Sequence, residues 1–223
     1  MKRKAVVLLS GGLDSAVTLF YAAKKGYGCR ALAFDYGQRH NKELLSAKRL
    51  AGRAGAKLFI VKLALPWKGS SLVDSRIPLP KDRSLTEIEK GIPSTYVPAR
   101  NTIFLSIAVS YAEAIGAEAI FIGAHFEDSS GYPDCRPEYL KAFDNAARLG
   151  TRAGLEGRLR IKSPLIRKTK REIIKLGASL GVPFQSTWSC YSGGRLPCMR
   201  CDSCLLRAKG FSAAGMKDPL INR

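Results

Sequence analysis

Apolar runs of strand length alternate with helix-length segments along most of the chain, and this alternation restricts the possible folds. The predicted strands lie at 5–9, 29–34, 57–63, 119–123 and 159–166, and the predicted helices at 13–25, 42–54, 102–115, 137–150 and 169–180. Strands separated by helices indicate parallel pairing with right-handed crossovers. The expected fold is therefore an α/β, Rossmann-like doubly wound sheet of five parallel strands.

A glycine-rich loop, Ser10-Gly11-Gly12-Leu13-Asp14-Ser15, joins the first strand to the first helix. Glycines permit close backbone approach, and a helix N-terminus directs N–H groups and positive dipole toward a bound phosphate. The loop has neither the Lys-Ser/Thr pair of a Walker A motif nor the spaced glycines of a dinucleotide site. An ordinary glycine turn is the alternative. A carboxylate beside phosphates requires a bridging cation, so Asp14 implies Mg²⁺.

This loop resembles the pyrophosphate loop of the ATP pyrophosphatases, which adenylate their substrates with ATP. The resemblance implies an ATP-binding segment that comprises Leu9, Ser10, Gly11, Gly12, Leu13, Asp14, Ser15, Ala16, Val17, Thr18 and Leu19. Basic residues near 162–171 can neutralise a triphosphate or a leaving pyrophosphate, although a solvated face is the alternative for half of them. We assign catalytic roles to Asp14, Ser15 and Lys170.

Length and composition favour one main domain with an appendage. The chain has 223 residues, 46% of them hydrophobic, which is enough for one substantial core. No apolar run reaches membrane-spanning length, and the basic start Met1–Lys4 precedes too short a run for a signal peptide. We expect a soluble cytoplasmic protein without membrane contacts, divided into a nucleotide-binding domain at 1–185 and a tail at 186–223.

The chain is strongly basic, with 37 Lys and Arg against 18 Asp and Glu and a net charge of +19. Nucleic acid and anionic small molecules are both candidate partners on this ground. Many of the charges have helical spacing, for which a solvated face is an equal alternative. Aromatic residues are not interleaved with them as in a single-strand binding platform. Charge alone does not identify the partner.

A Pro-, Gly- and Ser-rich insertion at about 66–98 interrupts the alternation, and its length is typical of a lid or a mobile excursion. A capping box, Ser84-x-x-Glu87, predicts one short helix within it. The chain then reaches Arg100 and Asn101 at the start of the next helix, where anions are favoured. Asp35–His40, after the second strand, is a second loop at the ligand-binding edge; His40 can orient substrate or simply bond to the backbone.

The loop at 125–136, after the fourth strand, combines acceptors, donors and an aromatic ring, which suits a polar planar heterocycle. Within it Asp134 can bind amidine-like N–H groups, Tyr132 can stack and Arg136 can hold a carboxylate. Gly131 sets the path of the loop together with Pro133. An irregular connection without a ligand is the alternative.

Four cysteines gather near the C-terminus: Cys190, Cys198, Cys201 and Cys204, with seven, two and two intervening residues. Disulfides are not expected in a cytoplasmic protein, and four thiolates suit tetrahedral zinc in a closed, structural site. An iron–sulfur cluster is the alternative. Cys29 falls in a strand and is read as an inert core thiol, and Cys135 lies in the loop that follows the fourth strand.

Further motifs narrow the family. Phe34–His40, Tyr96–Asn101, Ser130–Arg136, Thr187–Cys190 and Pro197–Cys204 resemble, in order and over nearly the whole chain, the motifs of the 7-cyano-7-deazaguanine synthases. The resemblance implies a ligase that uses ATP to convert 7-carboxy-7-deazaguanine and ammonia into the nitrile precursor of queuosine and archaeosine. It also implies one zinc per subunit and a homodimer. Substrate binding is then assigned to Arg100, Asn101, Gly131, Tyr132, Asp134 and Arg136.

No glutaminase region is evident, so free ammonia or a separate supplier is the expected nitrogen source. The loop type favours AMP and pyrophosphate as products, with ADP and phosphate as the alternative. A tRNA-modifying adenylating enzyme, of the thiolation or lysidine type, would explain the charge but needs a tRNA-binding appendage or a free catalytic cysteine pair. A zinc-ribbon nucleic-acid module with a degenerate nucleotide domain would bind in a salt-dependent way without ATP turnover. Direct nucleic-acid binding is not expected.

Overall fold

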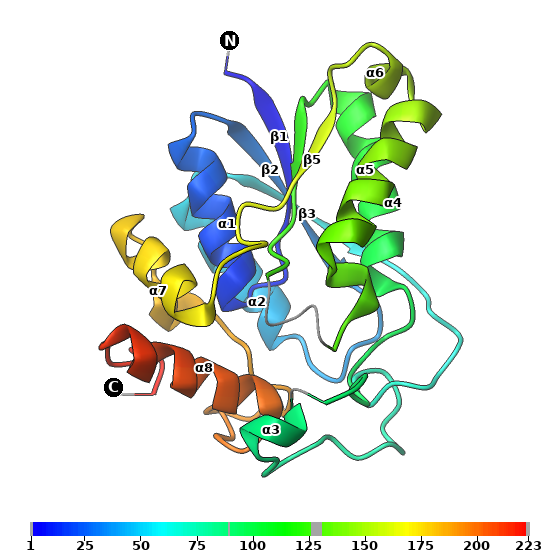
Figure 1. Ribbon diagram of the computed structural model, residues 1–223. Coiled ribbons are helices and arrows are strands. Elements are labelled where there is room, and N and C mark those ends of the chain that lie inside the picture. The colour runs from blue at the N-terminus through cyan, green and yellow to red at the C-terminus, as the bar shows by residue number, and fades with distance from the viewer. Residues whose placement is uncertain (1, 89, 126–130, 222–223) are drawn as a thin grey trace.

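The fold is a five-stranded parallel sheet covered by helices on both faces (Figure 1). A computed structural model describes residues 2–88, 90–125 and 131–221. The strands are β1 (Lys4–Leu8), β2 (Gly28–Asp35), β3 (Lys57–Lys62), β4 (Ala119–Phe121) and β5 (Arg160–Lys162), in the order β3-β2-β1-β4-β5. This confirms the fold class predicted from the alternation of strands and helices.

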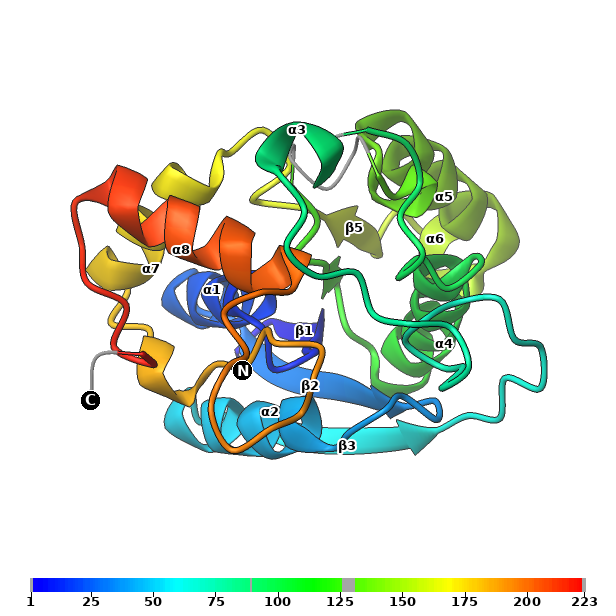
Figure 2. The same cartoon turned by 90° about the horizontal axis from the view of Figure 1, so that it is seen from below.

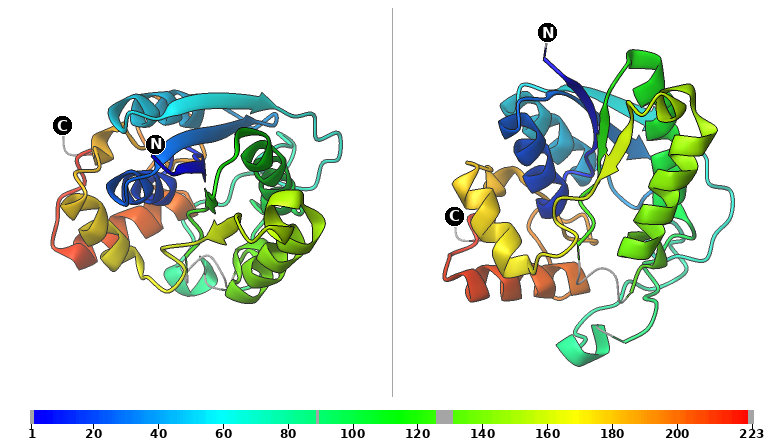
Figure 3. Two further views of the ribbon diagram at one scale, coloured as in Figure 1. Left: turned by 90° about the horizontal axis from the view of Figure 1, so that it is seen from above. Right: turned by 45° about the horizontal axis from the view of Figure 1, so that its top comes forward.

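Successive residues of the central strand face opposite layers of the core. Ala5 and Val7 pack on one face of the sheet, beneath α1 (Leu13–Lys24), α2 (Lys42–Arg53) and α7 (Lys170–Ser179). Val6 and Leu8 pack on the other, beneath α4 (Arg100–Ile115) and α5 (Pro137–Gly150). Figure 3 shows the two helical layers with the sheet between them. A strand buried on both faces reads as a continuous apolar run, as β1 does.

The order of the strands reverses beside β1. The chain moves from β1 outward to β2 and β3, then returns to place β4 on the other side of β1. The loops that follow β1 and β4 therefore diverge at the carboxyl end of the sheet, where ligands bind in open α/β sheets. The phosphate loop follows β1, and Gly123–His125 follows β4.

The C-terminal tail contains a helix, α8 (Asp202–Ala214), that our sequence analysis did not predict. Phe211 of α8 packs edge-on against Phe184 at 5.3 Å between ring centroids, within the core layer of α1 and α7. Seen from below, α8 lies beside α3 (Leu85–Ile88), the short helix of the insertion (Figure 2). The tail and the insertion therefore meet below the carboxyl end of the sheet.

Local signals placed several helix ends correctly. Thr169 and Glu172 form the predicted capping box at the start of α7, and Ser84 and Glu87 form the other at α3. A single-turn helix, α6 (Arg152–Leu155), and 3₁₀ turns at Pro133–Cys135 and Phe184–Ser186 complete the described elements. Within the described residues, no helix combines the length and apolarity needed to cross a bilayer.

Candidate active site

A cavity of about 310 Å³ opens at the carboxyl end of the sheet, beside the point where the strand order reverses. Its walls come from the phosphate loop, the ends of β2 and β4, the start of α4, the insertion and the tail. Its lining includes Ser10, Gly12, Asp14, Ser15, Phe34, Tyr36, Glu43, Arg100, Asn101, Phe104, Gly131, Tyr132, Lys170, Tyr191 and Asp202. One cavity therefore collects groups from parts of the chain that are far apart in the sequence.

The two serines of the phosphate loop form hydrogen bonds within the loop and fix its conformation beside the cavity. Ser15 Oγ donates to the carbonyl of Gly12 at 3.1 Å and lies 3.0 Å from Ser10 Oγ, which also accepts the Gly12 N–H at 3.2 Å. Gly12 is the N-cap of α1, so the N–H groups of the first helical turn have no acceptor within the helix. Such a turn is a suitable binding site for phosphate.

Gly11 must be glycine. Its φ of +91° lies in a region that side chains disfavour, and a Cβ there would lie 2.1 Å from the carbonyl oxygen of Glu43. The loop thus packs directly on the first turn of α2. This contact explains why two glycines stand side by side, one for its backbone angle and one as the helix cap.

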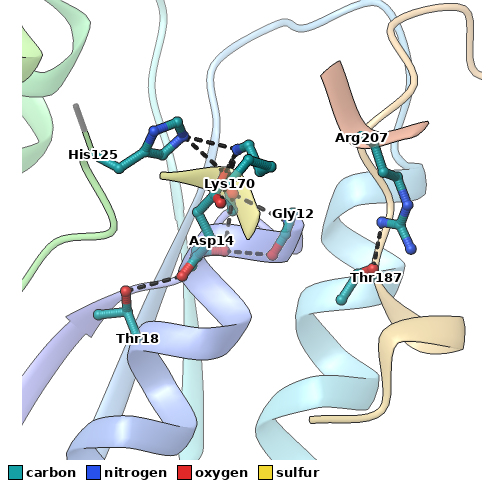
Figure 4. A network of polar contacts seen from close by, with 9 residues as sticks. Gly12, Asp14, Thr18, His125, Lys170, Thr187 and Arg207 are labelled. Atoms are coloured by element: carbon teal, nitrogen blue, oxygen red, sulfur yellow. Dashed lines mark hydrogen bonds and ion pairs between the residues drawn. The ribbon is translucent and has the colours of Figure 1, made fainter. Parts of the chain in front are cut away.

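A polar cluster at the N-terminus of α1 contains Asp14, Lys170 and His125 (Figure 4). Lys170 Nζ donates to both carboxylate oxygens of Asp14 at 2.9 Å and lies 2.8 Å from Nε2 of His125. An ammonium has only donors, so Nε2 of His125 is the acceptor. Burial raises the pKa of the Asp14 carboxyl, but Lys170 and His125 together more than offset this, and the pKa stays below its usual value.

Lys170 occupies an unfavourable position for a cation. It is the first residue of α7, and the positive end of a helix dipole repels positive charge. Pairing with Asp14 compensates for this cost while the ammonium stays in the cavity lining. This arrangement is typical of a functional group; the Mg²⁺ that the sequence implied beside Asp14 remains a prediction.

Aromatic rings form a second wall of the cavity. Phe34 and Phe104 stack with centroids 3.9 Å apart and planes 3° apart, and Tyr36 lies 5.5 Å from Phe104. Arg100 Nη1 donates to the Tyr36 hydroxyl at 3.3 Å, and its guanidinium lies 5.9 Å from the Tyr36 ring. Tyr132 is fixed from the insertion through a 2.8 Å hydrogen bond between its hydroxyl and Thr95. These flat surfaces suit planar heterocycles.

Glu43 also lines the cavity, and it leads to a prediction about pH. Burial raises the pKa of its carboxyl from 4.5 to about 7, with Arg100 offsetting part of the effect. The folded state therefore retains a proton between pH 4.5 and 7 that the unfolded chain releases. We expect the free energy of unfolding to fall by up to about 3 kcal/mol across that window as pH rises.

Urea denaturation at several pH values, comparing the natural chain with Glu43→Gln, measures this contribution. The difference in free energy between the two proteins should change between pH 4.5 and 7 and level off outside it. Glu118→Gln, a change of the same kind outside the cavity lining, is the control. An identical pH profile for the natural chain and Glu43→Gln would contradict the prediction.

The structure gathers most of the predicted site residues into the cavity. The lining includes Leu9, Ser10, Gly12, Leu13, Asp14, Ser15, Arg100, Asn101, Gly131, Tyr132 and Lys170. Ala16, Val17 and Leu19 are instead fully buried in the core of α1, and the Thr18 hydroxyl donates to the Asp14 carbonyl. Their predicted nucleotide contact remains a prediction, and the structure gives them a packing role beneath the loop.

Two predicted substrate residues lie outside the described cavity lining. Asp134 is buried, and its carboxylate accepts the N–H of Asn101 at 2.9 Å, which satisfies a free donor at the start of α4. Arg136 is exposed at the N-cap of α5. The part of the predicted loop at 126–130 lies outside the described residues.

Several cavity residues escaped our assignment of site residues. Glu43, Trp188, Tyr191, Asp202 and Arg207 line the cavity without having been assigned a role, and His125 contacts Lys170 of the lining. His125 directly follows the end of a predicted strand's apolar run, which was a usable signal. Asp202 stands between Cys201 and Cys204 of the cysteine cluster, and no local pattern marks it as a cavity residue. Their proximity to the loop depends on long-range packing that no local pattern encodes.

The four cysteines form one cluster that could hold a metal ion. Their sulfur atoms all lie within 4.8 Å of one another, and three of the four residues are buried. Backbone N–H groups of Ser192 and Cys198 approach Sγ of Cys190 at 3.4 and 3.2 Å, and that of Cys201 approaches Sγ of Cys198 at 3.3 Å. Four clustered thiols with N–H donors fit a closed tetrahedral site.

The tail is hydrogen-bonded to the phosphate loop. The backbone N–H of Trp188 donates to the Gly11 carbonyl at 2.9 Å, which fixes the orientation of the Gly11-Gly12 peptide. The residue before Trp188, Thr187, receives a 2.7 Å hydrogen bond from Arg207 of α8 (Figure 4). Arg207 is buried and pairs with Asp218 through bonds of 2.6 and 2.9 Å. The tail therefore contributes to loop geometry as well as to cavity walls.

The insertion is attached to the cysteine segment. Lys81 forms an antiparallel bridge with Cys201, and Asp82 accepts two bonds of 2.9 and 3.0 Å from Nε of Arg200. Next to them Arg83 Nη1 donates to Oδ2 of Asp202 at 2.9 Å. Three consecutive residues of the insertion thus contact three consecutive residues at the start of α8.

Comparison with known proteins shows the family of the chain. The family described as queuosine biosynthesis protein QueC matches residues 4–215. A 7-cyano-7-deazaguanine synthase of Trichodesmium erythraeum is 54% identical over 221 residues, covering 98% of this chain and all of that protein. Another of that name, from Thermoplasma acidophilum, is 54% identical over 219 residues, covering 98% of this chain and 92% of its own. The tRNA-modifying alternative is not favoured.

Likeness to a solved structure concerns the fold alone. A predicted subunit of a tRNA methyltransferase from Methanocaldococcus jannaschii superposes with a TM-score of 0.50 at 16% identity, covering 79% of this chain and 74% of that one. The family match, in contrast, spans the sheet, the phosphate loop and all four cysteines. The chain belongs to the family of the queuosine biosynthesis protein QueC.

Proposed function

We propose that this chain catalyses the ATP-dependent conversion of 7-carboxy-7-deazaguanine and ammonia into 7-cyano-7-deazaguanine. The observation that carries the proposal is the single cavity in which a phosphate-type loop, the Asp14–Lys170 pair and the aromatic wall of Tyr36 and Phe104 meet. The cavity provides an anion-binding helix terminus for ATP and flat surfaces for two heterocycles. The names of full-length relatives at 54% identity support the same reaction.

The chemistry requires activation of the same carbon twice. A carboxylate is a poor electrophile, so its oxygen first attacks ATP and becomes part of an adenylate, with pyrophosphate leaving. Ammonia adds to the carbonyl carbon, AMP leaves and a proton is released, which gives the amide. Adenylation of the amide oxygen and loss of a second AMP with the remaining N–H protons then gives the nitrile.

The residues of the cavity divide this work. The first turn of α1, Ser10 and Ser15 bind phosphate oxygens, and the Lys170 ammonium stabilises the charge that develops on the leaving pyrophosphate. The Arg100 guanidinium is placed to bind the substrate carboxylate. Tyr132, fixed by Thr95, offers a ring face to the deazapurine. Substrate binding by Asn101, Gly131, Asp134 and Arg136, which the sequence also assigned, remains part of the proposal.

The cofactors and partners are part of the proposal. Mg²⁺ would accompany ATP beside Asp14, the carboxylate of the phosphate loop, and would neutralise phosphate charge. Cys190, Cys198, Cys201 and Cys204 would hold one structural zinc per subunit. The nitrogen donor would be free ammonia or an external supplier, and the enzyme would act as a cytoplasmic homodimer. The proposed boundary between main domain and tail lies at residues 185 and 186.

Mass spectrometry of the reaction tests the function directly. The purified chain is incubated with 7-carboxy-7-deazaguanine, ammonium, ATP and Mg²⁺, and samples without ATP or with tRNA alone are the controls. ATP-dependent formation of the nitrile, with AMP as the nucleotide product, is expected. A mass change of tRNA without nitrile formation would refute the substrate, and ADP as product would refute adenylation.

A further inference from the structure

One oxygen of a buried carboxylate in the cavity wall lacks a partner. Asp202 is 5% exposed and lines the cavity, and its Oδ1 has no hydrogen bond to any described residue. Leaving an acceptor buried without a donor is costly for a folded protein, and more so for a charged group. An unsatisfied carboxylate oxygen at a cavity wall therefore points to a ligand that supplies the donor.

The other oxygen of Asp202 is anchored. Oδ2 accepts from Nη1 of Arg83 at 2.9 Å, which holds the carboxylate in one orientation and balances its charge. Asp202 is also the first residue of α8, where the helix dipole favours a negative charge. Oδ1 is thus held in one position, because Arg83 of the insertion binds the other oxygen and the backbone of Asp202 is fixed at the start of α8.

The surroundings of Asp202 suit a planar ring. Tyr191 and Tyr132 lie close to each other, and both line the cavity. Tyr191 also lies close to Asp202. A neutral aromatic pair beside a charged acceptor is the arrangement that binds a heterocycle by its face and by one N–H edge.

We propose that Oδ1 of Asp202 accepts a hydrogen bond from the exocyclic 2-amino group of the deazapurine and so determines specificity for a guanine-type ring. The inference rests on the proposed function and names the group that recognises its substrate. The other carboxylates are less suitable. Asp134 is already bound to the Asn101 N–H, and Asp14 is occupied by Lys170. Glu43 lines the cavity without an anchoring ion pair among the described contacts and serves as the competing candidate.

The test compares 7-carboxy-7-deazaguanine with its analogue that lacks the 2-amino group, 7-carboxy-7-deazahypoxanthine. The natural enzyme should prefer the amino substrate by roughly 100-fold in kcat/KM, because the analogue leaves Oδ1 unpaired. In Asp202→Asn, the amide oxygen must face Arg83, so the NH₂ group takes the place of Oδ1 and opposes the substrate's own donor. The variant should lose roughly 100-fold with the amino substrate and less than about 3-fold with the analogue.

Asp82→Asn is the matched control. Asp82 joins the same insertion to the same tail through Arg200, but it does not line the cavity, so its loss should leave the preference unchanged. Metal content, melting temperature and the KM for ATP are measured for each variant, because Asp202 adjoins Cys201. Equal losses with both substrates would overturn the proposal, as would loss of the preference in Glu43→Gln instead.

The natural enzyme alone also tests the inference, so the test remains possible even where the Asp202 variant does not fold. Nitrile formation from both compounds at equal kcat/KM would overturn the role of Asp202 and leave the proposed function intact. Absence of nitrile from the amino substrate would instead refute the proposed function. The two failures are therefore distinguishable.

Discussion

Replacing Lys170 with methionine is expected to lower kcat by at least about 10³-fold while the protein stays folded. Loss of one oriented donor to a developing charge costs about 3 kcal/mol of barrier. Here the loss is greater, because the ammonium also neutralises Asp14 at 2.9 Å, and an unpaired carboxylate at the mouth of α1 repels the phosphates of ATP. The KM for ATP should rise as well, because the repulsion acts before the chemical step.

The variant series separates a catalytic pair from a structural one. Asp14→Ala should also abolish turnover, and the double variant should be no worse than either single one, because the two groups act as a unit. Lys175→Met is the control, since Lys175 is exposed on the same helix and does not line the cavity. Turnover is followed by nitrile formation, and folding by circular dichroism. Retained activity in Lys170→Met would remove this residue from the catalytic assignment.

Elements with strong local signals were predictable. Apolar runs located the strands, and each observed strand begins within one residue of its predicted start, although β5 (Arg160–Lys162) is much shorter than the predicted 159–166. The phosphate loop was recognisable because its glycines, serines and carboxylate are consecutive in the chain. Capping boxes marked the starts of α3 and α7 for the same reason, since each box needs only four adjacent residues.

The cavity itself was less predictable. Arg83 and Asp202, or His125 and Lys170, are adjacent only after the chain folds, and no spacing rule relates them. For Asp134 the sequence suggested a ligand that the structure does not require. A carboxylate in a polar loop was interpreted as a substrate-binding group, but it accepts a hydrogen bond from the N–H of Asn101 at the start of α4. Helix α8 lacks a clear apolar stripe and contains Gly210, which contacts Lys170 and Ile174 of α7 more closely than a side chain would allow.

The second large effect is expected at the cysteine cluster. Cys201→Ser should remove most of the bound metal and lower the melting temperature by about 10 °C, since loss of a metal site is among the most destabilising single changes. Cys201 is fully buried among the other sulfur atoms and begins α8 as its N-cap. Serine offers a poorer ligand than a thiolate, so the remaining three cysteines cannot complete the closed site.

Loss of the metal should also disturb the conformation of the phosphate loop. The backbone of Trp188 binds this loop, and Arg207 of α8 binds Thr187, the residue before Trp188. We therefore expect Cys201→Ser to raise the KM for ATP even at temperatures where it remains folded. Metal analysis, thermal melts and steady-state kinetics measure the three effects. Cys29→Ser is the matched control, because Cys29 is a buried core thiol on β2, away from the cluster. Unchanged metal content in Cys201→Ser would eliminate the four-thiolate site, and a normal KM for ATP in a metal-free but folded variant would show that the loop keeps its geometry without the tail.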